Sequence, residues 1–253
     1  MATRSRPAGS ATIKRSSSSA RPPRSAKTSA STKTSKEKAA AAPHKTYHHG
    51  DLRRALLDAA VLELNEVGPD ELSLRGVARR AGVSHAAPYH HFADKSVLLA
   101  HLAAVGFTRF REHLVSAAAE GGDAPRLRLA RMGLGYLRFA RAEHALFALM
   151  GSSPSQTHAE VWAAAADASF AVLVDEVARV RADAGRTGRP EPDAYLHWSV
   201  VHGLAHLEQG FGLGHRVDVD ALYMHIAARV DAIYDEGARE PPSSLSMKLT
   251  TDC

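Results

Sequence analysis

Apolar residues recur every three or four positions along most of this chain, a spacing typical of amphipathic helices. The first run begins at Asp51 and continues to Val67, where Gly68 and Pro69 end it. Similar runs, bounded by Gly, Pro or polar clusters, predict helices over residues 74–81, 84–91, 95–120, 125–141, 143–150, 158–184, 192–210 and 219–236. No segment alternates convincingly with the period of two that a half-buried strand requires. The pattern therefore predicts an all-α protein of about nine helices.

Two of the predicted helices, 74–81 and 84–91, are short and nearly adjacent. Ser73 and Ser84 are typical N-cap residues, and Gly82 ends the first short helix. A longer helix followed by two short helices with a glycine-containing turn is the layout of a helix-turn-helix. In that unit the second short helix enters the major groove of DNA, while flanking groups bind phosphates. The layout therefore predicts a DNA-binding unit.

The side chains of the second short helix suit this role. His85, Ala86 and Ala87 occupy its first turn, where base edges would be met. The histidine can hydrogen-bond a base acceptor, and the two alanines permit close approach to a thymine methyl group. Phe92 is expected to anchor the helix in the core.

Donors for phosphate lie beside these residues. Tyr89, His91 and Lys95 can donate hydrogen bonds to phosphate oxygens, and Arg75 can do so from the preceding short helix. His90 and His91 do not favour a metal site, because adjacent helical residues point about 100° apart. No nucleophile accompanies either histidine in a catalytic arrangement, so we expect no enzyme.

Positive charge is concentrated at the start of the chain. Residues 1–46 carry 11 Lys or Arg and one acid, whereas residues 47–253 carry 21 basic and 26 acidic residues. Because residues 1–46 and 238–253 have little to bury, we expect both to be disordered tails. The basic tail is either a solvated extension or an arm that attracts phosphate without sequence preference.

Composition excludes several other classes of protein. Cys253 is the only cysteine, which excludes an intramolecular disulfide and a zinc site built from cysteines. No apolar run approaches the roughly 18 to 20 residues of a membrane helix, and no secretory signal is recognisable. We therefore expect a cytoplasmic protein without membrane contact.

The run DLRRALLDAAVLELNEVGPDELSLRGVARRAGVSHAAPYHHFADKSVLL resembles the N-terminal DNA-binding domain of TetR-type transcriptional regulators, over residues 47–102. Its most specific part is Ala81-Gly82-Val83-Ser84 followed by Tyr89-x-His91-Phe92-x-Asp94-Lys95-x-x-Leu98. The segment WSVVHGLAHLEQG, residues 198–210, resembles the Trp…His-Gly signature of one C-terminal subclass. The resemblance implies a three-helix DNA-binding domain over residues 47–95 and a helical ligand-binding and dimerisation domain over residues 96–237.

The resemblance also implies partners and contact residues. The positions that it implies for DNA contact are Arg75, Ser84, His85, Ala86, Ala87, Tyr89, His91 and Lys95. Pro88 departs from the family pattern, lacks an amide N–H and can delay the helix start, in which case Ser84 or His90 would take over base contact. The implied protein is a homodimeric repressor, without a cofactor, that a small-molecule effector releases from a palindromic double-stranded operator.

Two further sites follow from the resemblance. An interface is implied in the last two helices, where the candidates are Trp198, Val201, His202, Ala205, Leu222 and Ile226. Apolar stripes of this kind are also typical of an ordinary core. A ligand cavity is implied in the same domain, with candidate lining residues Phe139, Phe147, Met150, Trp162 and Phe170.

His202 and His206 have the i,i+4 spacing that can hold zinc, with His197 and Glu208 nearby in sequence. Spacing fixes no third ligand, and histidines hydrogen-bonded within a core or interface give the same pattern. The main hypothesis is the effector-released repressor. The alternatives are a DNA-organising protein that needs no effector, and a metal sensor or metal-dependent enzyme built on these two histidines.

Overall fold

The computed structural model describes residues 49–152 and 157–235. This part of the chain contains eight α-helices and three short 3-10 helices, and it contains no strand. The all-α prediction is confirmed. Both predicted tails, residues 1–46 and 238–253, lie outside the described residues. The α-helices are α1 (His49–Glu71), α2 (Leu74–Ala81), α3 (Lys95–Ala119), α4 (Pro125–Ala142), α5 (His144–Met150), α7 (Ala159–Asp183), α8 (Glu191–Phe211) and α9 (Val219–Asp231), and the 3-10 helices are η1 (Ala87–His90), η2 (Leu213–His215) and η3 (Ala232–Tyr234).

Most helix ends fall where the sequence predicts them. The first helix changes direction at Gly68, which has φ 75° and ψ 174°, and Pro69 begins a last short turn. Glycine reaches this backbone conformation without the steric cost that a side chain would add. The final helix α9 ends at Asp231 and not at residue 236, and η3 follows it.

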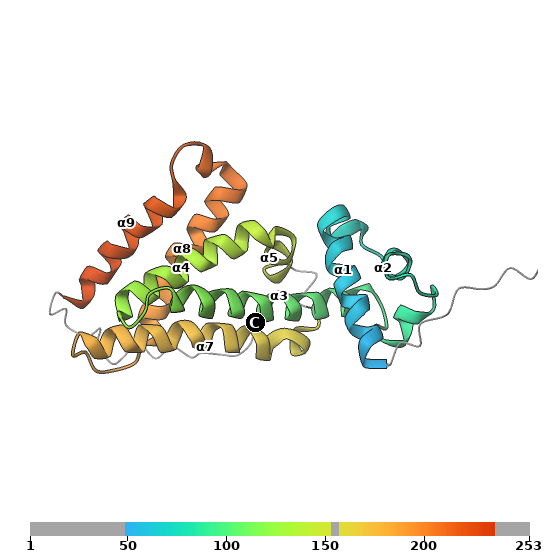
Figure 1. Ribbon diagram of the computed structural model, residues 1–253, viewed down its shortest axis with the longest axis horizontal. Coiled ribbons are helices and arrows are strands. Elements are labelled where there is room, and N and C mark those ends of the chain that lie inside the picture. Colours follow the sequence, from blue (N-terminus) through green and yellow to red (C-terminus); the bar gives the residue numbers. More distant parts are fainter. Residues whose placement is uncertain (1–48, 153–156, 236–253) are drawn as a thin grey trace, which may run out of the picture. The chain divides into compact units, whose positions relative to one another are not determined.

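Helix α3 is shared between two hydrophobic cores. In Figure 1 it lies between α4 and α7, and it contacts both. Near its start, Leu98 and Leu102 are fully buried in a core formed with α1, α2 and α5. Near its end, Phe110 and Leu114 belong to a second core formed with α4, α8 and α9. One continuous helix therefore connects the two cores.

The second core depends on a close contact between α4 and α9. Gly133 lies on α4 directly against Tyr223 of α9, and a Cβ atom at position 133 would stand 1.8 Å from the Tyr223 hydroxyl oxygen. Tyr223 is 4% exposed. The absence of a side chain at Gly133 thus allows α9 to pack on α4. None of the described helices is long and apolar enough to cross a membrane.

Candidate functional site

Helix α2 is fixed at both ends by its flanking residues. The Ser73 hydroxyl oxygen accepts a hydrogen bond from the Gly76 amide at 3.0 Å. Gly82 is left-handed, with φ 68°, and the following Val83 amide donates to the Ala78 carbonyl at 3.0 Å. This pattern satisfies carbonyl groups at the helix end. The predicted cap and the predicted stop are both confirmed.

The second helix of the motif is shorter than the sequence predicts. Only Ala87–His90 is helical, as the 3-10 helix η1, and Ala86 holds its N-cap position. Proline is favoured in a first helical turn because the amide that it lacks would have no intrahelical partner there. Pro88 therefore fits a helix that begins at Ala87. The prediction that Ser84 caps this helix is wrong, since Ala86 holds the N-cap position and it is the backbone carbonyl of Ser84 that accepts a turn hydrogen bond from the Ala87 amide at 3.0 Å.

Most residues predicted to contact DNA are exposed. These are Arg75, Ser84, His85, Ala86, Tyr89 and His90, whereas Ala87, His91 and Lys95 are half-buried. Tyr89 has an exposed fraction of 51%. Between these residues Pro88 and Phe92 turn inward, and both are buried. The segment thus has a polar and aromatic outer face over an apolar base.

Lys95 links this segment to the end of α1. Its Nζ donates a hydrogen bond to the Asp70 carbonyl at 2.6 Å. An ammonium group has three donors, so this bond leaves others for a phosphate. Asp94 caps α3, the helix that begins at Lys95, because its carboxylate accepts a hydrogen bond from the Val97 amide at 3.0 Å.

Phe92 anchors the segment, as predicted. It is fully buried, the Arg53 guanidinium lies 5.7 Å from its ring centroid, and the His101 ring meets it edge-on at 5.5 Å. Arg53 Nη2 also lies 3.1 Å from His101 Nδ1. Burial, and then the nearby Arg53 charge, lower the pKa of His101. Sequence reasoning missed both residues, because 48 positions separate them and no motif joins them.

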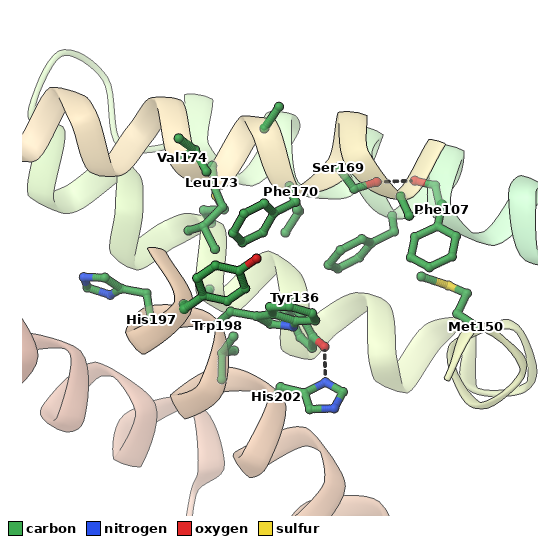
Figure 2. Close-up of a pocket in the computed structure, with 18 of the residues that line it drawn as sticks. Phe107, Tyr136, Met150, Ser169, Phe170, Leu173, Val174, His197, Trp198 and His202 are labelled. Carbon is green, nitrogen blue, oxygen red and sulfur yellow. Dashed lines mark hydrogen bonds between the residues drawn. The ribbon is translucent and has the colours of Figure 1, made fainter. Parts of the chain in front are cut away.

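A cavity of about 830 Å³ lies between α3, α4, α5, α7 and α8. Figure 2 shows side chains from these helices around it. Four of the five predicted lining residues do line it, namely Phe147, Met150, Trp162 and Phe170. The prediction for Phe139 is wrong, because that ring is fully buried in the core beside Phe110 and does not reach the cavity.

Tyr136 and His202 form a polar pair on the cavity wall. The Tyr136 hydroxyl lies 2.6 Å from His202 Nδ1, as the dashed line in Figure 2 marks. Burial raises the pKa of Tyr136, so its hydroxyl keeps its proton and can donate it to this nitrogen. Burial, and then the neighbouring His206, lower the pKa of His202. Sequence reasoning missed Tyr136, which is 66 positions away.

The two histidines of the metal hypothesis do lie together. The ring centroids of His202 and His206 are 4.3 Å apart. Within residues 49–152 and 157–235, however, no third His, Cys, Asp or Glu joins them in a group that could hold a metal ion. The His202 Nδ1 atom is already engaged by Tyr136.

The predicted interface residues divide between core and cavity. Val201 is 5% exposed and Ala205 is fully buried, and both belong to the core of their own chain. The prediction that these two form an interface is therefore wrong. Trp198 and His202 line the cavity, although Trp198 keeps an exposed fraction of 40%. Half-buried Leu222 and Ile226 pack against the same core.

A different stripe of α8 faces outward. Leu196, Leu207 and Phe211 expose 41%, 45% and 78% of their surfaces. Gly203 and Gly210 lie on the same side of the helix, and a Cβ atom at either position would meet nothing within 4 Å. We call these five residues the outer α8 stripe. Its apolar and small residues were readable in the sequence, but their direction was not.

Two family models together match most of the residues that the structure describes. Residues 56–102 match the family model "Bacterial regulatory proteins, tetR family", and residues 129–230 match "Tetracyclin repressor-like, C-terminal domain". The HTH-type transcriptional regulator BetI of Escherichia coli (strain K12 / DH10B) is 47% identical over 47 residues, which are 19% of this chain and 24% of BetI. The chain thus matches about a quarter of the length of this curated relative.

Solved structures extend the similarity to both cores. A protein of unknown function from Rhodococcus sp. RHA1 is 36% identical, with a TM-score of 0.65, over 74% of this chain and 97% of that one. A putative TetR-family transcriptional regulator from Rhodococcus sp. is 26% identical, with a TM-score of 0.50, over 72% of this chain and 98% of that one. With family models matched in both its N-terminal and C-terminal halves, this chain belongs to the TetR family of bacterial regulatory proteins.

Proposed function

We propose that the protein is a transcriptional regulator that binds double-stranded DNA through α2 and residues 84–90. The observation that carries this proposal is the outer face formed by Arg75, His85, Ala86 and Tyr89, held over the buried Phe92. Small and polar side chains there can approach base edges, and Arg75 and Tyr89 can donate to phosphates. The family of the chain supports the same function.

We propose further that it acts as a homodimer. A single helix-turn-helix reads few base pairs, and dimers bind two half-sites about 34 to 36 Å apart. The outer α8 stripe is the surface we assign to the partner copy, because its exposed apolar residues would be desolvated there. Gly203 and Gly210 would let two such helices approach closely.

The proposed mode of action is repression that a small molecule relieves. Helix α3 supports it, because Phe107 and Phe110 line the cavity while Leu98 and Leu102 pack in the core beneath the DNA-binding segment. A ligand that favours one position of α3 would change the separation of the two reading units in a dimer. A coupling free energy of about 1–3 kcal/mol would weaken operator binding by about 5- to 150-fold.

The experiment that tests this function combines sedimentation with DNA binding. We expect a dimer at micromolar concentration, and we expect Leu207→Glu with Phe211→Glu to give monomers that bind an operator weakly. Thr108→Glu is a matched control, since Thr108 is exposed on α3 and belongs neither to the outer α8 stripe nor to the cavity lining. A monomeric wild-type protein would contradict the dimer. Tight binding to all sequences alike would favour the DNA-organising alternative.

A further inference from the structure

The charges that line the cavity have one sign. Within the described residues its charged lining consists of Asp167 and Asp175 on α7 and Glu191 at the start of α8, with no Lys or Arg. Burial lowers the pKa of His197 to about 4 and also lowers that of His202, so these two of the three lining histidines are mainly neutral at pH 7. The third, His206, is exposed and lies beside Phe147 of α5. An anionic ligand would lose its hydration beside the three carboxylates without a Lys or Arg to pair with.

Two of these carboxylates are available to a ligand. Glu191 lies 3.3 Å from Arg189 and is partly neutralised by it. Asp167 and Asp175 are exposed, and within residues 49–152 and 157–235 neither side chain has an ion pair or hydrogen bond. They are eight positions apart on α7, which separates them by about 12 Å along the helix axis and by about 80° around it. A cationic group in the cavity could therefore contact one of them directly and gain from the negative potential of the other.

Aromatic rings adjoin these carboxylates. Phe170 lies between them in sequence, and its ring centroid is 4.8 Å from that of Tyr195 and 5.8 Å from that of Trp198. Figure 2 shows Phe170 and Trp198 meeting across the cavity from α7 and α8. Aromatic faces attract ammonium-type cations, most strongly where water is excluded. The three rings and the two carboxylates therefore both favour a positively charged ligand.

From this arrangement we infer that the cavity binds a hydrophobic organic cation, meaning an amine or a quaternary onium group attached to an aromatic or aliphatic body. The cationic group would lie beside Asp167 and the ring of Phe170, which are three positions apart on α7, and Asp175 would add negative potential from about two turns away. The body would occupy the apolar space toward Trp162 and Met150. The class of ligand is inferred from the cavity alone. That such a ligand controls DNA binding rests on the proposed function.

The tryptophans provide a direct measurement. The chain has two, Trp162 and Trp198, and both line the cavity, so intrinsic fluorescence reports on this site. The probes are tetraphenylphosphonium and tetraphenylborate, which share a four-phenyl shape and carry opposite charges. We expect saturable quenching by the phosphonium ion, with an affinity at least about tenfold higher than that of the borate ion, or about 1.4 kcal/mol.

Two variants test whether the carboxylates cause the preference for the phosphonium ion over the borate ion. Asp167→Asn with Asp175→Asn should remove most of the preference for the phosphonium ion. Asp183→Asn is the matched control, because Asp183 is exposed on the same helix but does not line the cavity, and it should change nothing. Equal or tighter binding of tetraphenylborate, no binding of tetraphenylphosphonium, or an unchanged preference in the double variant would each overturn the inference.

DNA binding, measured separately, distinguishes this inference from the proposed function. If tetraphenylphosphonium binds with the expected preference but does not release the protein from DNA, the ligand class stands and effector-released repression fails. If the protein binds DNA specifically but takes up only tetraphenylborate, the regulator stands and the ligand class is wrong.

Discussion

Replacing Asp231 with asparagine should stabilise the protein at neutral pH. Asp231 closes α9, is 8% exposed, and its Oδ1 atom has no hydrogen-bond partner among the described residues. The closest basic group to that oxygen is His197 Nε2 at 3.9 Å, on a ring whose pKa burial lowers to about 4. Burial raises the pKa of Asp231 from 3.8 to about 6. A negative charge at a helix C-terminus is also unfavourable.

The sign and size of the effect follow from this pKa. Below pH 3.8 the carboxyl is protonated in both the folded and the unfolded chain, and it costs nothing. As the pH rises toward 6, the unfolded chain loses its proton first, so stability falls. Well above pH 6 the full cost is present, and the difference between a pKa of 3.8 and one of about 6 corresponds to about 3 kcal/mol. Asparagine has the same shape without the charge, so Asp231→Asn should recover as much as about 3 kcal/mol at about pH 7.5.

Urea unfolding of wild type and variant at equal protein concentration measures this gain at pH 7.5 and at pH 4. We expect a clear gain at pH 7.5 and little at pH 4. Asp235→Asn is the control, because Asp235 is paired with Arg126, which lowers the pKa of that carboxyl, and it should give no gain at pH 7.5. An Asp231→Asn variant no more stable than wild type at pH 7.5, or equally stabilised at both pH values, would show that the Asp231 charge does not destabilise the folded chain.

Three further predictions concern DNA binding and packing. His85→Ala should relax the base preference at one position of each half-site, at a cost of about 1–3 kcal/mol, whereas Lys95→Ala should weaken binding to all sequences alike. Binding to a library of operator variants measures both effects. The reverse result would assign base reading to Lys95 and phosphate contact to His85. Deleting residues 1–44 should reduce the slope of log affinity against log salt by about 0.9 for each phosphate that the tail neutralises, and an unchanged slope in a salt titration would show that the tail does not contribute. Gly133→Ala should destabilise the fold by about 1–3 kcal/mol in urea unfolding, because the new methyl group would collide with Tyr223; undiminished stability would contradict that packing.

Local sequence signals predict much of this fold. Ser73, Gly82 and Asp94 mark helix ends through interactions with their own near neighbours, and the structure shows each of them doing so. The same reasoning fails at Ser84, which has the side chain of a cap. Pro88 fits best in the first turn of a helix, and the helix therefore begins at Ala87.

The direction that an apolar stripe faces cannot be predicted from one helix. The periodicity of α8 shows that Val201 and Ala205 are apolar neighbours, but a core of the same chain and a partner copy produce the same pattern. Only the positions of the other helices show that both residues face inward, while Phe211 faces outward. The sequence likewise does not show whether Phe139 lines the cavity, because an aromatic residue on a buried helix face can either pack against other rings or line an empty space.

The most direct experiment asks whether the face formed by α2 and residues 84–90 reads DNA sequence. In it, the protein selects bound fragments from a random duplex DNA library. We expect an enriched inverted repeat, whose half-sites are spaced by about one helical turn or a multiple of it. We also expect the His85→Ala protein to enrich the same repeat with one position of each half-site relaxed. Failure of the wild-type protein to enrich any sequence, or the same repeat recovered with Arg75, His85 and Tyr89 all replaced by alanine, would contradict the claim that this face reads DNA.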